Sequence, residues 1–173
     1  LTKIFSEAEC ITSLPIDLWH GNPRWDMIDF RRYRCHNWHA WTNSKQEAAP
    51  YGVTYTSVSC PFKCDYCAIQ NFYGGRYEPR NIERITADFD YFAVKGIENV
   101  KIMDELFTFN NRRVNAVCDY LKGGRFNIWV YARFDKVDEI MLKKMKQAGI
   151  NWLAYGIDDL KGGMTYGKIK RII

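Results

Sequence analysis

The sequence predicts an α/β fold: a partial (βα) barrel of about four parallel βα units, preceded by an irregular Trp-rich linker. From Tyr51 onward, strand-like runs alternate with segments whose apolar residues recur at helical spacing. Gly and Pro stand where these helical segments begin and end. The connections between successive strands are about a dozen residues or longer, and such connections join parallel strands through right-handed crossovers.

The elements follow from local pattern. The first expected strand is 51–57, which is rich in β-branched and aromatic residues. The first expected helix is 81–95, which follows Pro79 and precedes Gly96. The other expected elements are strand 97–103, a helix around 114–121, strand 126–132, a helix capped by Asp138 and ended by Gly149, strand 150–155, and a fourth helix from Leu160 onward.

The chain divides at residue 50. Residues 1–49 have no repeating period and contain four of the six Trp residues. We expect this linker to pack against the following domain, with a short helix and a docked segment in 25–34, and to be the end of a missing N-terminal region. Residues 50–173 form the expected core domain. Because the chain begins with Leu1 and stops in basic sequence, we expect it to be a C-terminally truncated piece of a longer protein.

Composition limits the functional classes. The chain has 173 residues, 47% of them hydrophobic, and a mean hydropathy of -0.39 without a long apolar run, which excludes a membrane span. The net charge is +5, but Lys and Arg are scattered, so they indicate a solvated surface and do not indicate a nucleic-acid site. Cys118 lies on an apolar helical stripe, where a small core residue is expected. Three other Cys residues cluster, which indicates metal binding and hence a reducing, cytoplasmic compartment.

Cys60, Cys64 and Cys67 follow the first expected strand, with three residues and then two residues between them. A short loop with this spacing can turn three sulfurs toward one point, and Cys thiolates are the usual ligands of iron–sulfur clusters. No fourth Cys or His follows within the next fifty residues, so one iron would keep an open position for chemistry. A non-catalytic zinc or closed iron–sulfur module is the alternative, and it would need that fourth ligand.

The Cys-x-x-x-Cys-x-x-Cys motif, with Tyr66 before its last Cys, resembles the signature of the radical S-adenosylmethionine (AdoMet) superfamily. The resemblance implies that Cys60, Cys64 and Cys67 bind a [4Fe-4S] cluster whose open iron binds the amino and carboxylate groups of AdoMet. The reduced cluster would cleave AdoMet to a 5′-deoxyadenosyl radical. An electron donor such as flavodoxin or ferredoxin would be a partner, and the substrate stays unknown.

The linker carries a narrower resemblance. A Pro-x-Trp-Asp run from Pro23, then Tyr33-Arg34, then a His-Asn-Trp-His stretch at 36–39 are similar to the linker of cobalamin-binding radical AdoMet enzymes. This branch implies a cobalamin domain in the missing N-terminal region, cobalamin as a further cofactor, and methyl transfer or a related C–H modification. A methylthiotransferase acting on RNA or protein is the rival within the superfamily.

Charged residues gather at the carboxyl ends of the expected strands, where parallel barrels carry their active sites. Asp104 and Glu105 follow the second strand, Arg133 follows the third, and Asp158 lies just beyond the fourth. In the family that the motif resembles, an acidic residue after the second strand accepts hydrogen bonds from the AdoMet amino group. Which of Asp104 and Glu105 would do so stays open.

The resemblance also implies roles for the other positions. Arg133 would pair with the AdoMet carboxylate, or it would form a structural salt bridge to Asp135 or Asp158. Asp158 stands in a Gly-Ile-Asp run similar to an element of the family that reaches a ribose hydroxyl. Tyr66 would cover the adenine or shield the cluster, and plain packing is its alternative.

Overall fold

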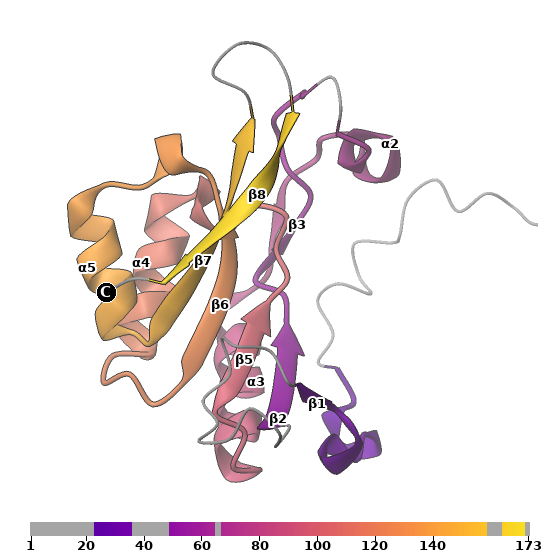
Figure 1. The fold of residues 1–173 in the computed structure, drawn as a ribbon. Helices are drawn as coiled ribbons and strands as arrows, with labels where there is room; N and C mark the ends of the chain where they lie inside the picture. The colour runs from indigo at the N-terminus through magenta and orange to yellow at the C-terminus, as the bar shows by residue number, and fades with distance from the viewer. Residues whose placement is uncertain (1–22, 36–48, 65–66, 159–163, 172–173) are drawn as a thin grey trace, which may run out of the picture.

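Four parallel strands form the centre of the fold, which a computed structural model describes for residues 23–35, 49–64, 67–158 and 164–171 (Figure 1). The main sheet has six strands in the order β1-β2-β5-β6-β7-β8. Its parallel strands are β2 (Ala49–Thr54), β5 (Asn99–Ile102), β6 (Asn127–Ala132) and β7 (Ile150–Asp158). The edge strands β1 (Arg34–Cys35) and β8 (Met164–Arg171) are antiparallel to their neighbours. The predicted α/β class with four parallel strands is confirmed.

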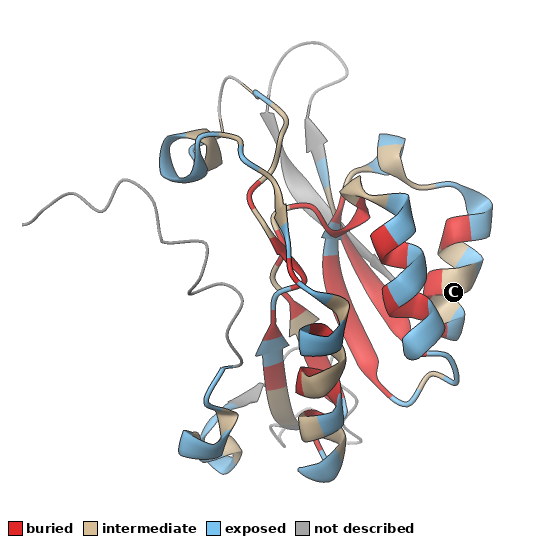
Figure 2. Cartoon of the chain, turned by 180° about the vertical axis from the view of Figure 1, so that it is seen from behind, coloured by how far each residue is buried: buried red, intermediate tan, exposed pale blue. Residues whose placement is uncertain are grey.

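Three helices connect the parallel strands and cover one face of the sheet (Figures 1 and 2). They are α3 (Ile82–Val94), α4 (Asn111–Tyr120) and α5 (Glu139–Gln147). Each begins at a side chain that accepts a backbone hydrogen bond from the first turn, namely Asn81, Asn110 and the predicted cap Asp138. The shorter elements are η1 (Trp25–Met27), η2 (Phe30–Arg32), β3 (Ser57–Val58), α2 (Ile69–Tyr73), β4 (Glu78–Pro79), η3 (Phe107–Phe109) and η4 (Phe134–Lys136).

The hydrophobic core lies between the helices and the sheet (Figure 2). Alternate strand residues point into it because successive side chains of a strand lie on opposite faces. The largest fully buried side chains include Phe89 and Phe92 of α3 and Ile102 of β5. Cys118 belongs to this core, as predicted, and burial raises the pKa of its thiol to about 12.

Gly149 follows the end of α5, as predicted, and lies in a turn that leaves no room for a side chain. Its φ is +84°, and a Cβ at this position would lie 2.2 Å from the carbonyl oxygen of Phe126. We expect Gly149→Ala to lower the free energy of unfolding by about 3 kcal/mol or more, because it adds backbone strain to a clash with immobile backbone. Denaturant unfolding measures this loss.

Gly74 supplies the matched control. It also has a positive φ, +60°, but a Cβ there would meet nothing within 4 Å. Gly74→Ala should therefore cost only about 1 kcal/mol, the price of the left-handed conformation alone. Equal losses for the two variants would contradict the close contact at Gly149.

The first and last predicted elements differ from the structure. The expected strand 51–57 is divided: β2 ends at Thr54, and Ser57–Val58 form β3, which pairs with β4 instead. The helix expected from Leu160 onward is wrong over 164–171, where β8 pairs with β7, whereas Leu160 itself lies outside the described residues. The edge of β7 offers unpaired backbone groups, and the Thr, Tyr and Ile residues of this segment favour a strand over a helix.

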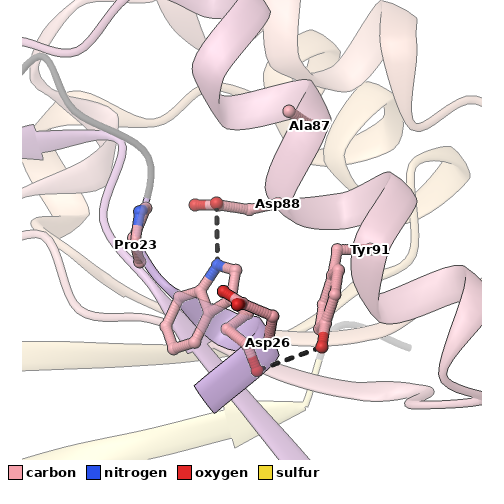
Figure 3. Close-up of a pocket in the computed structure, with 6 residues that line it drawn as sticks. Pro23, Asp26, Ala87, Asp88 and Tyr91 are labelled. Carbon is pink, nitrogen blue, oxygen red and sulfur yellow. Dashed lines mark hydrogen bonds between the residues drawn. The ribbon is translucent and has the colours of Figure 1, made fainter. Parts of the chain in front are cut away.

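The linker residues 23–33 pack against α3, as predicted, with two short 3-10 helices in place of a single helix. Trp25 donates from Nε1 to Asp88 over 2.8 Å, and the Tyr91 hydroxyl donates to the carbonyl of Trp25 over 3.0 Å. Figure 3 shows these contacts around a small pocket that Pro23 and Asp26 also line. The linker is therefore attached to the core through a buried carboxylate.

The structure bears on the linker motif at 36–39 and on the membrane span as follows. His36 and His39 lie outside the described residues. Among the described residues, no helix is both long enough and apolar enough to cross a membrane.

Candidate functional site at the carboxyl end of the sheet

The cysteine loop begins directly after β3 and ends at α2. Cys60, Cys64 and Cys67 are all half-buried, and the backbone N–H of Cys67 donates to the carbonyl of Cys64 over 3.0 Å. Gln70, in α2, donates from its amide nitrogen to the carbonyl of Cys60 over 2.8 Å and also to that of Phe62. Helix α2 therefore fastens the first half of the loop, a role that sequence analysis did not predict.

The thiols influence one another. Burial raises the pKa of Cys60, and the nearby thiols of Cys64 and Cys67 raise it further. A backbone hydrogen bond at Phe62 and the positive charge of Arg133 act in the opposite direction. The Arg133 guanidinium also lies 4.2 Å from the centroid of the Phe62 ring. A cation thus stands beside the loop and opposes part of the rise in the pKa of Cys60.

In the part of the chain that the structure describes, no three His, Cys, Asp or Glu side chains are arranged as a metal site. The donor set nevertheless suits an iron–sulfur cluster by its chemistry. It consists of three Cys residues on one loop, partly shielded from water and next to a cation. Tyr66, between the second and third of these Cys residues, lies outside the described residues.

Asp104 is fully buried and has no free oxygen for a ligand. One carboxylate oxygen accepts from the backbone N–H groups of Thr56 and Ser57 over 2.6 and 3.1 Å. The other accepts from both hydroxyls and from Arg113, whose guanidinium lies 3.1 Å away. Asp104 therefore ties the start of β3, the strand that leads into the cysteine loop, to β5 and α4.

Arg113 is the buried partner of Asp104, and sequence analysis did not predict it. It is buried, and besides Asp104 it donates to the Tyr77 hydroxyl over 2.8 Å and to the Phe107 carbonyl over 3.3 Å. A signal was present in the sequence, because Arg113 precedes Val114 on the apolar stripe of α4. A charged residue on a core-facing stripe requires a buried partner.

Glu105 differs from its neighbour. It is half-buried, and its Oε2 atom is buried without a hydrogen-bond partner among the described residues. Burial raises the pKa of Glu105, and the charge of Asp104 adds to this effect, whereas backbone hydrogen bonds at Glu105 and Ser59 oppose it. Since a buried polar atom normally has a partner, Glu105 is an acceptor with room for a donor.

Ser59, the residue before Cys60, has an uncommon backbone conformation. Its φ is 67°, the left-handed region that a residue with a Cβ rarely adopts. The side chain is buried, and its hydroxyl has no hydrogen-bond partner in the described part of the chain. Ser59 therefore holds a strained turn that directs the chain from β3 into the cysteine loop. Such strain collects at functional sites.

The other two predicted site residues, Arg133 and Asp158, lie at the ends of β6 and β7. Arg133 forms a bidentate ion pair with Asp135, at 2.8 and 3.0 Å, which is the structural alternative that the sequence left open. The pair is partly exposed, so a ligand carboxylate can compete for the guanidinium. Asp158 is the last residue of β7 and pairs with Met164 of β8. Its side chain is outside the described part, so its ribose contact stays a prediction.

Comparisons with known proteins bear on the fold. No protein-family profile matches the chain. Two solved structures of TsrM, a radical S-adenosylmethionine methyltransferase from Kitasatospora setae, superpose with a TM-score of 0.58 at 21% identity, over 67% and 68% of this chain. The chain therefore shares part of the α/β fold of TsrM. One TsrM structure contains tryptophan and the AdoMet analogue aza-SAM, and the other contains cobalamin and a [4Fe-4S] cluster.

A relative by sequence is an uncharacterized methyltransferase from Pyrococcus horikoshii. It is 26% identical over 139 residues, which are 79% of this chain and 28% of the relative. The chain spans about a quarter of the length of these proteins.

Proposed function

We propose that this chain is the cluster-binding part of a radical AdoMet enzyme, with methyl transfer through cobalamin as its reaction. The observation that carries the proposal is the unpartnered carboxylate oxygen of Glu105 near a loop of three half-buried Cys residues, at the carboxyl end of a parallel sheet. Bound together, a [4Fe-4S] cluster and AdoMet would supply one-electron cleavage of a carbon–sulfur bond.

The side chains of the chain would then divide the binding work. Cys60, Cys64 and Cys67 would hold the cluster as thiolates. Glu105 would accept hydrogen bonds from the AdoMet ammonium, because it is the acidic residue after β5 with an unused buried oxygen. Asp104 would act as a positioning residue that keeps the cysteine loop in place. Arg133 would turn from Asp135 to the AdoMet carboxylate.

The cobalamin part of the proposal has separate support. The TsrM structures that share the fold include one with cobalamin, and the linker of this chain is similar to that of cobalamin-binding enzymes. Residues 23–33 are docked on α3, so a domain that precedes them would be attached closely to the core. A reducing cytoplasm, with flavodoxin or ferredoxin as electron donor, suits three free thiols.

Anaerobic reconstitution with iron and sulfide tests the proposal. The expected product is brown, contains about four iron atoms per chain, and changes its electron paramagnetic resonance spectrum when AdoMet is added. Bound cobalamin in the full-length protein would support methyl transfer. About eight iron atoms per full-length chain would favour a methylthiotransferase instead. A colourless protein that binds zinc would refute the enzyme assignment.

Glu105→Gln should weaken AdoMet binding by about tenfold to a hundredfold, because it removes the negative charge that faces the ammonium. Isothermal titration of the reconstituted protein with AdoMet measures this loss, and iron content should stay unchanged. Glu98→Gln is the control, since Glu98 is exposed and lies at the opposite end of β5. Normal AdoMet affinity in Glu105→Gln would remove this residue from the site.

A further inference from the structure

The side chain of Gln70, in α2, holds the backbone of the cysteine loop at two points. Its Nε2 atom donates to the carbonyl of Cys60 over 2.8 Å and to that of Phe62 over 2.5 Å. An amide nitrogen carries two hydrogens, so both are used on the loop. Neither bond involves a thiol. Gln70 therefore fixes the backbone of residues 60–62 and leaves the sulfur of Cys60 available to a metal.

Two glycines leave room for the Gln70 amide. Gly74 ends α2, and its backbone N–H donates to the Gln70 carbonyl over 2.8 Å. Gly74 and Gly75 have φ angles of +60° and +73°. A Cβ at Gly75 would lie 2.6 Å from Oε1 of Gln70, whereas a Cβ at Gly74 would meet nothing within 4 Å. Non-bonded atoms do not approach this closely, so a side chain at residue 75 would push the flexible Gln70 amide off the loop.

The Phe62 ring is held by other elements. Its centroid lies 4.2 Å from the guanidinium carbon of Arg133 and 5.3 Å from the ammonium nitrogen of Lys136. Phe109 of η3 packs against it edge-on, with 6.0 Å between the ring centroids. The segment between the first two Cys residues is therefore fixed through its backbone by α2 and through its aromatic side chain by the strand ends that surround the loop.

We propose that Gln70 is a positioning residue for the metal-binding loop, and that Gly75 is required to keep its amide in place. A ligand loop that is already ordered binds its metal more tightly, because its conformational entropy has been lost on folding and not on binding. Outer groups that orient metal ligands typically contribute about 10- to 100-fold to metal affinity. The inference deepens the proposed function and rests on it for the identity of the metal centre, whereas the order of the loop is a property of the chain alone.

Alkylation of the chain with monobromobimane before reconstitution, with each thiol followed by peptide mapping, tests the order of the loop. Gln70→Met keeps the length of the side chain and removes both donors, so Cys60 should react about tenfold faster. Gly75→Ala should do the same, whereas Gly74→Ala, which has the same kind of backbone strain, should not. Asn71→Met is a second control, because Asn71 is the exposed next residue of α2. After reconstitution, Gln70→Met and Gly75→Ala should lose iron to a chelator about tenfold faster than wild type.

Cys118 separates a local effect on the loop from general destabilisation, because it is buried in the core and reacts only when the domain opens. If Gln70 merely stabilises the fold, Gln70→Met will raise the reaction rates of Cys60 and Cys118 together, which overturns the proposal. Equal Cys60 rates in Gly75→Ala and Gly74→Ala, or a wild-type rate of iron loss from Gln70→Met, also overturn it. Selective opening at Cys60 in a chain that takes up no iron–sulfur cluster would leave the role of Gln70 in the loop standing and refute the proposed enzyme function.

Discussion

Replacing Cys60, Cys64 and Cys67 together with alanine is expected to abolish both iron incorporation and formation of 5′-deoxyadenosine. The three thiols are the only Cys side chains of the loop, and the described part of the chain offers no other cluster of metal-binding side chains that could replace them. Each single substitution should have nearly the same effect on AdoMet cleavage, because a cluster that loses one of three protein ligands is no longer held.

The fold should survive this change. All three Cys residues are half-buried and none belongs to the hydrophobic core. Far-ultraviolet circular dichroism and the thermal midpoint should therefore stay close to wild type. Cys118→Ala is the opposite case: Cys118 is buried in the core, so this variant should lose about 1 kcal/mol of stability and keep its iron. A triple variant that still makes 5′-deoxyadenosine would refute the cluster assignment.

Asp104→Ala is expected to destabilise the chain by about 3–5 kcal/mol, because it leaves the buried guanidinium of Arg113 without a counter-ion. It also deprives the backbone N–H groups of Thr56 and Ser57 of their acceptor. Domains of ordinary size have only about 5–15 kcal/mol of stability in total. Much of the Asp104→Ala protein should therefore be unfolded at 37 °C, as urea denaturation followed by tryptophan fluorescence would show.

Asp135→Ala is the control for this prediction. Its carboxylate pairs with Arg133 at the surface, where both side chains are more than one-third exposed, and surface pairs contribute about 0–1 kcal/mol. The Asp104→Ala variant also tests which of Asp104 and Glu105 contacts AdoMet, a question that the sequence left open. An Asp104→Ala protein with wild-type stability and no AdoMet binding would show that Asp104, and not Glu105, contacts the cofactor.

Much of the fold was predictable because its signals are local. The apolar stripe of α3, the cap at Asp138 and the end at Gly149 each depend on a few neighbouring residues, and all three are confirmed. The last element was not predictable in this way. β8 forms because the edge of β7 is free to accept a strand, and a sequence pattern does not show which edge is free.

The sequence by itself determined the order of the four parallel strands and of the three helices between them, and the end of the sheet where charged residues meet, since these follow from short-range periodicity. It also gives the spacing of the three Cys residues directly. Only the tertiary structure distinguished the surroundings of Asp104 from those of Glu105, which keeps a buried oxygen without a partner among the described residues. Asp104 is occupied by Thr56, which lies 48 positions earlier in the chain, and by Arg113 from the next helix. Burial and hydrogen bonding between distant residues settle which carboxylate is used up and which is left open, and no local pattern carries that information.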